Sequence, residues 1–376
     1  MSSSWVEISK NAIKSNIHSF KSILQPGVKF AAIVKSNAYG HGILEVSKIA
    51  ISSGADLLGV NSLDEAIFLR QNLPDTKILI MGEIPDLKEK TKFVSDPNFS
   101  IVVSRLDEIQ ILNSLPSPPK IHLKTDTGMG RLGFHGKKLT DLICEIKEEN
   151  IELHGIMTHF ASTEDFTEHS YSKMQLSLFK EYIEFAKKIG FENLTKHSAS
   201  SASTILFRDA HFDMVRVGIS LYGLWPSRET KLSHSLVGKN EFRLTPALSW
   251  KTKIVHIQDL EIGSYIGYGS TYKTNYPTKV AVLPVGYFEG IDRRLSNQGN
   301  ILIKGRRARI LGRVCMNMCM IDVTHIPEVT IGDTVVLIGK SGDESISADD
   351  ISSMIGTINY EVVTNIHASI PRLIVD

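Results

Sequence analysis

The chain has 376 residues, of which 42% are hydrophobic and 22% are charged, and its formal net charge is +1. This composition is ordinary for a globular protein of two domains, or of one large barrel with a smaller module. The small net charge gives no electrostatic signal for nucleic acid or an acidic membrane surface, and no apolar run has the length of a transmembrane helix. We therefore expect neither nucleic acid nor a membrane as a partner.

The three cysteines, Cys144, Cys315 and Cys319, are too few and too scattered for a disulfide framework. Sparse cysteines, and a first segment without the apolar core of a secretory signal, fit a reducing cytoplasm. Cys315 and Cys319 have no Cys or His close by in sequence, so we expect no metal site there.

The first 224 residues alternate short apolar segments with amphipathic ones. Eight segments rich in Val, Ile and Leu are expected to be strands: 29–35, 57–61, 77–82, 100–104, 120–125, 153–159, 196–199 and 214–220. Strands that are apolar on both faces are typical of parallel sheets covered by helices. Eight of them, each followed by a helix or loop, predict an α/β fold with a (β/α)8 TIM-like barrel, and a doubly wound open sheet is the main alternative.

Two of the helical segments carry start signals. Ser62 and Glu65 have the spacing of a capping box, in which each side chain accepts a hydrogen bond from the backbone of the other residue. Ser104 and Asp107 repeat that spacing. The longest expected helix covers 170–190 and ends at a glycine.

The pattern changes after residue 223. The polar segment 223–246 has prolines near both ends and is interpreted as a linker. Beyond it, short Val/Ile-rich stretches alternate with Gly and Pro turns, which predicts a β-rich domain with one short helix near 347–356. We therefore divide the chain into a barrel, 1–235, and a C-terminal, mainly β domain, 236–376.

Lys35 follows the first expected barrel strand, in the stretch "KFAAIVKSNAYGHG". Active sites of barrels are built at the carboxyl ends of their strands. A single lysine at a strand end is more commonly a surface residue, but the apolar residues before Lys35 would desolvate its amine and lower its pKa. A neutral lysine can form a Schiff base with a carbonyl cofactor.

Polar residues also follow the other expected strands. The segment after the fifth strand carries Lys124, Asp126 and Arg131, and His159 follows the sixth. The loops after strands seven and eight of barrels commonly bind phosphate, a role that Ser201 and the backbone N–H groups around Gly218 and Ile219 would suit. A Schiff-base lysine with a phosphate site is the arrangement expected for pyridoxal 5'-phosphate.

The stretch "AIVKSNAYGHG" closely resembles the cofactor-lysine signature of the alanine racemases. Six further strings resemble family motifs in family order: "KTDTGMGRLG", "THFAS", "MVRVGISLYG", "YGSTY", "GRVCMNMCMIDVT" and "NYEVVT". The resemblance implies an N-terminal barrel, a C-terminal β-domain, pyridoxal phosphate, and a homodimer with active sites shared between chains. The implied activity is the interconversion of L-alanine and D-alanine, which supplies D-alanine for bacterial cell-wall peptidoglycan.

The resemblance also assigns catalytic roles. Lys35 carries the cofactor and is one acid/base, and Tyr268 is the second base on the opposite face of the α-carbon. His159 and Arg216 assist the tyrosine through a hydrogen-bond chain, and Arg216 faces the pyridine nitrogen. Because arginine stays protonated, it cannot give that nitrogen a full proton, which disfavours transamination. From the residues alone, Tyr268 and His159 could equally be structural, and Arg216 could be an ion-paired barrel residue.

The remaining matches concern binding. By resemblance, the cofactor phosphate is bound by Tyr39, Ser201, Gly218, Ile219 and Tyr360. The residues that by resemblance bind the substrate carboxylate and line the entrance to the site are Arg131, Met316 through its backbone N–H, and Tyr287. Lys124 matches a lysine that is often carbamylated, which would let it hold Arg131, although a solvated surface lysine fits the sequence as well.

The sequence departs from the family pattern without removing a catalytic group. The departures are Ser36, Ser200, Phe288, Glu289 and Asn317.

Three alternative functions remain. The nearest is a racemase of broader specificity, because one extra methylene is rejected by only ~1–3 kcal/mol. Amino acid decarboxylases share the two-domain layout, but Arg216 at the ring nitrogen argues against them. A cofactor carrier without catalysis would not need both Lys35 and Tyr268.

Overall fold

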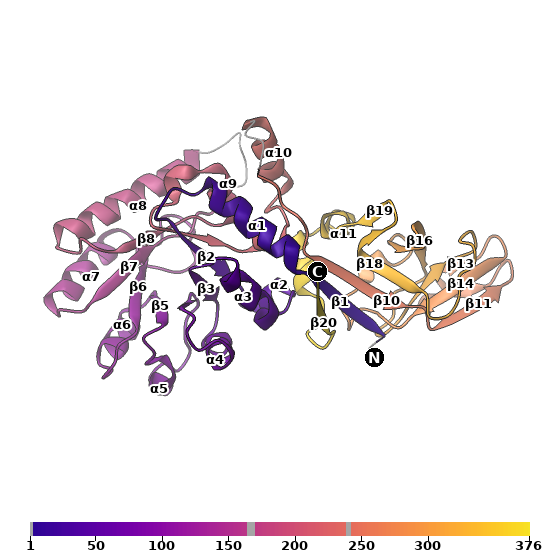
Figure 1. Cartoon of the computed structure of the whole chain (residues 1–376), viewed down its shortest axis with the longest axis horizontal. Coiled ribbons are helices and arrows are strands. Elements are labelled where there is room, and N and C mark those ends of the chain that lie inside the picture. Colours follow the sequence, from indigo (N-terminus) through magenta and orange to yellow (C-terminus); the bar gives the residue numbers. More distant parts are fainter. Residues whose placement is uncertain (1–2, 164–169, 238–241) are drawn as a thin grey trace. The chain divides into compact units, whose positions relative to one another are not determined.

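The computed structural model describes residues 3–163, 170–237 and 242–376, which are shown in Figure 1. The chain forms two compact units. The barrel unit comprises residues 12–38 and 43–245, and the β unit comprises residues 1–11, 39–42 and 246–376. The short loop 39–42, directly after the strand-end lysine, thus belongs to the β unit.

The barrel unit is built on an eight-stranded parallel sheet. Its strands are β2 (Lys29–Ile33), β3 (Leu57–Val60), β4 (Ile78–Ile80), β5 (Phe99–Val103), β6 (Lys120–Lys124), β7 (Leu153–Met157), β8 (Thr195–His197) and β9 (Met214–Val217). They are ordered β8-β7-β6-β5-β4-β3-β2-β9. These are the eight strands that the apolar segments predicted.

The sheet nearly closes on itself between its two end strands. The amide of Asp213 donates to the carbonyl of Lys196 at 3.1 Å, and the amide of Arg216 donates to the carbonyl of Ala199 at 3.0 Å. These bonds link β8 and β9 across what would otherwise be an open edge. The prediction of a barrel is confirmed, and the open doubly wound sheet is ruled out.

Helices alternate with the strands and lie around them in Figure 1. They are α1 (Lys10–Ile23), α2 (Lys35–Tyr39), α3 (Ile43–Ser52), α4 (Leu63–Asn72), α5 (Thr91–Val94), α6 (Leu106–Asn113), α7 (Gly136–Glu148), α8 (Ser170–Lys188), α9 (Ser201–Leu206) and α10 (Arg228–Val237), with short 3-10 turns η1 (Arg208–Ala210) and η2 (Ile219–Tyr222). The long helix predicted for 170–190 is confirmed as α8. The apolar faces of the helices pack on the strands, so Phe30, Leu58 and Ile78 are fully buried.

The capping box predicted at the start of α4 is present. The amide of Glu65 donates to Ser62 Oγ at 3.2 Å, and the amide of Ser62 donates to Glu65 Oε2 at 3.3 Å. This reciprocal pair satisfies two backbone donors that the helix itself cannot bond.

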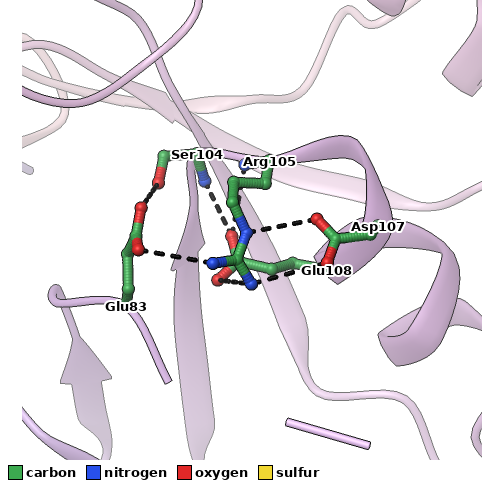
Figure 2. A network of polar contacts seen from close by, with 5 residues as sticks. All are labelled: Glu83, Ser104, Arg105, Asp107 and Glu108. Atoms are coloured by element: carbon green, nitrogen blue, oxygen red, sulfur yellow. Dashed lines mark hydrogen bonds and ion pairs between the residues drawn. The ribbon is translucent and has the colours of Figure 1, made fainter. Parts of the chain in front are cut away.

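The analogous pair predicted for α6, Ser104 with Asp107, is wrong (Figure 2). Helix α6 begins one residue later than a serine cap would require, and the side chain that accepts from the preceding backbone is Glu108. It accepts from the amides of Ser104 at 3.1 Å and Arg105 at 3.2 Å. Ser104 Oγ instead donates to Glu83 at 3.0 Å, and Asp107 pairs with Arg105 at 3.1 Å.

The segment 223–246, interpreted as a linker, contains a helix and belongs up to residue 245 to the barrel unit. Helix α10 lies within it, while residues 238–241 lie outside the described part. Aromatic rings hold the segment in place: Trp225 lies 6.0 Å from Phe242, and Phe242 lies 5.0 Å from Phe20 of α1. The polar composition concealed these few anchoring rings, so the linker interpretation was incorrect.

The β unit contains a ten-stranded sheet, which agrees with the prediction of a β-rich domain. The path is β11-β14-β17-β16-β15-β18-β10-β1-β20, with β19 paired to β18 and a separate hairpin β12-β13. The bounds are β1 (Ser4–Ser9), β10 (Leu248–Lys253), β11 (His256–Leu260), β12 (Tyr265–Ile266), β13 (Tyr272–Lys273), β14 (Thr278–Leu283), β15 (Asn300–Ile303), β16 (Arg306–Leu311), β17 (Cys319–Asp322), β18 (Thr334–Ser341), β19 (Glu344–Ile346) and β20 (Arg372–Val375).

Two short helices complete the β unit. The predicted one is α11 (Ala348–Ile355), whose start is capped by Ser347 and Asp350. The other, α12 (Asn359–Thr364), was not anticipated. Strand β1 was also missed: it pairs antiparallel with β10 and parallel with β20, so both chain ends contribute to this sheet. None of the helices in the described part of the chain combines the length and the apolar composition that a membrane span requires.

Candidate active site

Lys35 lies just beyond β2 and opens an unusual turn. Ser36, Asn37 and Ala38 have φ of 54°, 53° and 54°, so the segment labelled α2 is a left-handed turn. None of these residues is glycine, and a left-handed conformation costs L-residues roughly 1–2 kcal/mol each. Strain of this kind is typical of functional sites, where the surrounding structure enforces it.

Specific hydrogen bonds enforce the turn after Lys35. The Ser36 amide donates to Glu65 Oε1 at 2.5 Å, and the Ile43 amide donates to Asn37 Oδ1 at 2.9 Å. Glu65 thus serves both the start of α4 and the turn, because its other oxygen accepts from the amides of Asn61 and Ser62. The position of Lys35 is therefore fixed by its backbone.

The amine of Lys35 is poorly hydrated. Burial lowers its pKa from the ordinary value, and the charge of Arg131 lowers it further, while Glu65 acts in the opposite direction. The buried strand before it, Phe30 to Val34, is the source of the desolvation. A larger fraction of this amine is neutral at a given pH than for a solvated lysine.

Lys124, at the end of β6, belongs to the same cationic group. It is buried, and burial together with the charges of Arg216, Arg131 and Lys35 lowers its pKa to about 8; Asp126 opposes this shift. Four cationic side chains thus influence one another at the carboxyl ends of the strands. Such an excess of positive charge is suited to an anionic ligand.

The loop that carries Arg131 is folded around a carboxylate. Asp126 Oδ1 accepts from the amides of Gly128 at 2.9 Å and Met129 at 2.7 Å, and Oδ2 accepts from Gly130 at 2.9 Å. With its oxygens occupied by backbone donors, Asp126 shapes the loop. Arg131 itself is exposed at the end of the loop.

Arg216, on β9, is buried and bonded on several sides. Its Nη2 donates to the carbonyls of Thr158 at 2.9 Å and Ser198 at 3.0 Å. The same nitrogen lies 3.4 Å from His159 Nδ1, and Nη1 lies 3.0 Å from His197 Nδ1. Burial lowers the pKa of Arg216 to about 10, so the guanidinium stays charged at neutral pH. Burial and that charge lower the pKa of His159 to about 3, which keeps its ring neutral.

The ends of strands β8 and β9 meet at Ser201 and Gly218. Ser201 opens α9, and its Oγ accepts from the Gly218 amide at 3.0 Å. Ile219 follows as the first residue of η2. Ser200, one of the departures from the family pattern, caps α9, and its amide donates to Ser203 Oγ at 2.7 Å.

The β unit holds the other sequence-predicted residues. The rings of Tyr39 and Tyr360 lie 6.1 Å apart, and burial raises the pKa of Tyr39 to about 12. The loop after Tyr39 packs closely on α12, because a Cβ added to Gly40 would lie 2.0 Å from the carbonyl oxygen of Val363. The structure therefore brings these two tyrosines together.

Tyr268 is highly exposed. It opens the turn η3 (Tyr268–Ser270), with 70% of its surface accessible, between Gly267 and Gly269, both of positive φ. A Cβ at Gly269 would lie 2.8 Å from the guanidinium of Arg313. The flanking glycines thus allow a tight turn that projects the tyrosine.

Tyr287 and Met316 are also exposed and lie on adjoining segments. The Tyr287 amide donates to the Cys315 carbonyl at 3.0 Å, and the Phe288 amide donates to the Met316 carbonyl at 2.9 Å.

The departures Phe288, Glu289 and Asn317 fall here. Phe288 packs against His367 with ring centroids 4.6 Å apart, and Asn317 Nδ2 donates to Glu289 Oε1 at 2.9 Å. Two of the departures therefore complement each other.

Sequence reasoning missed two residues that are linked to Arg216 by hydrogen bonds, one directly and one through the other. His197 bonds Arg216 directly, and His122 bonds His197 at 2.9 Å. The available signal was weak: His122 is a polar residue at the centre of an apolar strand, and His197 begins "HSASSAS" at the end of another.

Comparison with known proteins gives full-length matches. An alanine racemase of Leptospira interrogans serogroup Icterohaemorrhagiae is 55% identical over 374 residues, which covers 100% of this chain and 96% of that protein. One of Methanococcus maripaludis is 42% identical and covers 98% of each chain. The crystal structure of alanine racemase from Bacillus anthracis with bound L-Ala-P superposes with a TM-score of 0.91 at 36% identity, covering 100% of this chain and 96% of that one.

The nearly closed parallel barrel, the desolvated lysine at its carboxyl end and the β-rich unit define the two-domain class of barrel enzymes that use pyridoxal phosphate. Residues 8–226 match the family description "Alanine racemase, N-terminal domain", and residues 247–374 match "Alanine racemase, C-terminal domain". The chain belongs to the alanine racemase family.

Proposed function

We propose that this chain racemises alanine by a two-base reaction in which Lys35 and Tyr268 act on opposite faces of the α-carbon. As a member of its family, the chain is an isomerase that interconverts L-alanine and D-alanine with pyridoxal 5'-phosphate. The observation that carries the two-base proposal is the desolvated Lys35 amine, held by a strained turn beside the charge of Arg131.

The residues of the barrel unit fit the cofactor. Lys35, Lys124, Arg131 and Arg216 form an excess of positive charge that a phosphate and a carboxylate would neutralise. We propose that Lys35 binds the cofactor covalently and that Arg216 faces its pyridine nitrogen. The proposed phosphate ligands are Tyr39, Ser201, Gly218, Ile219 and Tyr360. When bound, pyridoxal phosphate withdraws electrons from the α-carbon of an amino acid and so acidifies its proton.

Racemisation requires a proton to leave one face of the α-carbon and another to arrive on the opposite face. Lys35 is suited to one role, because its lowered pKa makes the neutral amine accessible. Tyr268 needs assistance, since a phenol with a pKa of ~10 is a weak base at neutral pH.

His159 is suited to give that assistance. The guanidinium of Arg216 can only donate, so the Nδ1 of His159, 3.4 Å away, accepts. The neutral ring then carries its proton on Nε2. That N–H is available to donate to the oxygen of Tyr268 and to stabilise the phenolate.

Arg216 also restricts the reaction. Its pKa of about 10 keeps it charged at neutral pH, so it does not hand a full proton to the pyridine nitrogen. Electron withdrawal by the ring stays moderate, which disfavours transamination.

Substrate binding is proposed for Arg131, the Met316 N–H and Tyr287. Arg131 would pair with the substrate carboxylate. Lys124, with its pKa of about 8, has a neutral fraction that can react with CO2 to form a carbamate and a proton. The resulting anion would hold Arg131 and relieve the repulsion among the cations.

We further propose a homodimer in which Tyr268 enters the partner's active site. The support is the position of the two bases on different units, together with the exposure of Tyr268, Tyr287 and Met316. A two-fold dimer would complete two such sites at once. The compact units place the boundary at residues 245 and 246 rather than 235 and 236, and assign residues 1–11 to the β unit. We also propose a cytoplasmic location and the supply of D-alanine for peptidoglycan.

The test is chiral chromatography of alanine incubated with the purified protein and pyridoxal phosphate. The protein should convert L-alanine to an equal mixture of enantiomers, and Lys35→Ala should not. L-Serine and L-2-aminobutyrate in parallel distinguish a strict enzyme from a broader racemase, since each adds a single group to alanine. Formation of pyruvate or CO2 without D-alanine would contradict the proposal.

A further inference from the structure

A chain of three buried side chains runs through the interior of the barrel unit. Arg216 on β9 contacts His197 at the end of β8, with Nη1 and Nδ1 3.0 Å apart. His197 Nε2 in turn lies 2.9 Å from Nδ1 of His122, in the middle of β6. The exposed fractions of Arg216, His197 and His122 are 4%, 0% and 6%. This series of three side chains therefore starts beside the candidate active site and continues into the barrel.

The chemistry of arginine fixes every proton along this chain. A guanidinium has five N–H donors and no acceptor, so His197 Nδ1 must be the acceptor. A neutral His197 then carries its proton on Nε2, which donates to His122. His122 Nδ1 is consequently the acceptor of that bond, and its own proton lies on Nε2. Both imidazoles are thus restricted to the Nε2–H form.

The surroundings keep both rings neutral. Burial is the largest cause of the lowered pKa of each, and the charge of Arg216 contributes to both. Lys124 also faces His197, while Lys120, Lys29 and His154 face His122. Among the described residues, none of the groups that shift either pKa is a carboxylate.

The backbone around His122, the last of the three side chains, leaves room for its imidazole ring. A Cβ added to Gly155 on β7 would lie 2.3 Å from His122 Nδ1, so the imidazole occupies the space that a side chain there would fill. His122 also lines a cavity of about 480 Å³ at the amino ends of the strands, together with Lys29 and Lys120. The His122 ring is thus confined between a glycine and this cavity.

We propose that His197 is a positioning residue for Arg216, and that His122, by accepting from Nε2–H of His197, holds this ring where its Nδ1 can accept from the guanidinium. This inference rests on the proposed role of Arg216 at the pyridine nitrogen. Two carbonyls and one imidazole nitrogen fix the plane of the guanidinium. Without the His197 acceptor, Nη1 loses the one side-chain partner that it has among the described residues, and the plane can turn away from the cofactor ring.

Two amide variants of similar polarity separate the two contacts of His197. In His197→Asn, Oδ1 takes roughly the place of Nδ1 and can accept from Arg216, but the contact with His122 is lost. In His197→Gln, the amide reaches roughly the place of Nε2 and keeps the contact with His122, but the acceptor for Arg216 is lost. A merely structural role of the imidazole predicts similar losses in both.

We expect kcat for racemisation to fall about 100-fold in His197→Gln, which corresponds to a misplacement of about 1 Å. In His197→Asn it should fall less than about fivefold. KM for alanine should stay within about twofold in both, because Arg131 rather than Arg216 is proposed to bind the carboxylate. Equal losses in the two variants, or a larger loss in His197→Asn, would overturn the proposal.

The protonation pattern is tested without the cofactor or turnover. Two-bond 15N–1H correlation spectra of the apo protein, assigned with the His197→Asn and His122→Leu variants, report the tautomer of each ring. Both should be Nε2–H at pH 7. In His122→Leu, His197 loses the acceptor for its Nε2–H, but Arg216 still requires an acceptor at Nδ1, so His197 should remain in the Nε2–H form. An Nδ1–H or doubly protonated His197 in the wild-type protein would overturn the proposal even if a variant failed to fold.

These measurements also separate the inference from the proposed function. If the wild-type protein did not racemise alanine, the proposed function would fail, while the tautomers would still be determined. If it racemises alanine and the two amide variants behave alike, the positioning role alone fails.

Discussion

The Gly218 amide donates a 3.0 Å hydrogen bond to Oγ of Ser201, which ties together the loops after the last two strands of the barrel. The bond holds a hydroxyl and a row of backbone N–H groups at one end of the sheet. Loops in these positions commonly bind phosphate in barrels.

We therefore predict that Ser201→Ala weakens binding of pyridoxal phosphate. A hydrogen bond to a charged group is worth about 1.5–3 kcal/mol, so Kd should rise roughly 10- to 100-fold. Fluorescence titration of the apo protein measures it. Ser203→Ala, in the same helix but with its hydroxyl directed to Ser200, is the control and should change Kd little. Equal Kd values for Ser201→Ala and the wild type would remove Ser201 from the phosphate site.

Borohydride reduction of the protein with bound cofactor should fix the cofactor to Lys35. The reason is the desolvation that lowers the pKa of this amine. Peptide mass mapping locates the label. Lys124 is the residue that could compete with Lys35 for the label, because it is also a buried lysine of lowered pKa. A label on Lys124, or no label in the wild type, would contradict the assignment, whereas Lys124→Met should still be labelled at Lys35.

Carbamylation of Lys124 should depend on pH in a defined direction. Its lowered pKa of about 8 makes about half of the amine neutral at pH 8 and only about 1% at pH 6. Since only the neutral amine reacts with CO2, a carbamate signal from 13C-bicarbonate should appear at pH 8 and diminish towards pH 6. NMR spectra of Lys124→Gln provide the control. Persistence of the signal in that variant would place the carbamate elsewhere.

Replacing Arg216 should change the outcome of the reaction as well as its rate. A glutamate there would favour a protonated pyridine nitrogen and stronger electron withdrawal by the ring. Arg216→Glu should therefore increase pyruvate formed per alanine racemised, whereas Arg216→Lys, which keeps the positive charge, should not. Coupled assay of pyruvate and chiral chromatography give the ratio. An unchanged ratio in Arg216→Glu with cofactor bound would show that this residue does not face the ring nitrogen.

Local patterns predicted the features that depend on neighbouring residues. Most of the barrel strands follow from short runs rich in Val, Ile and Leu, and the cap of α4 follows from the spacing of Ser62 and Glu65. The desolvation of Lys35 follows from the strand before it. In each case the cause lies within a few residues along the chain.

Features that depend on distant residues were missed or misread. Strand β1 pairs with β10 and β20, which are far away in sequence, and α10 is anchored by a few aromatic rings within a polar segment. The link between His122 and His197 joins two strands that are not adjacent in the sheet. The left-handed turn after Lys35 consists of residues that rarely adopt this conformation, so no propensity could indicate it.

We propose that Lys35 of one chain and Tyr268 of another form each active site, and subunit complementation is the decisive test of this arrangement. Lys35→Ala and Tyr268→Ala should each be nearly inactive. After equal mixing and random exchange, half of the dimers should be hybrids with one intact site, so racemisation should recover to about a quarter of the wild-type activity. If both bases came from one chain, hybrids confirmed by mass spectrometry would remain inactive, and the shared site would be contradicted.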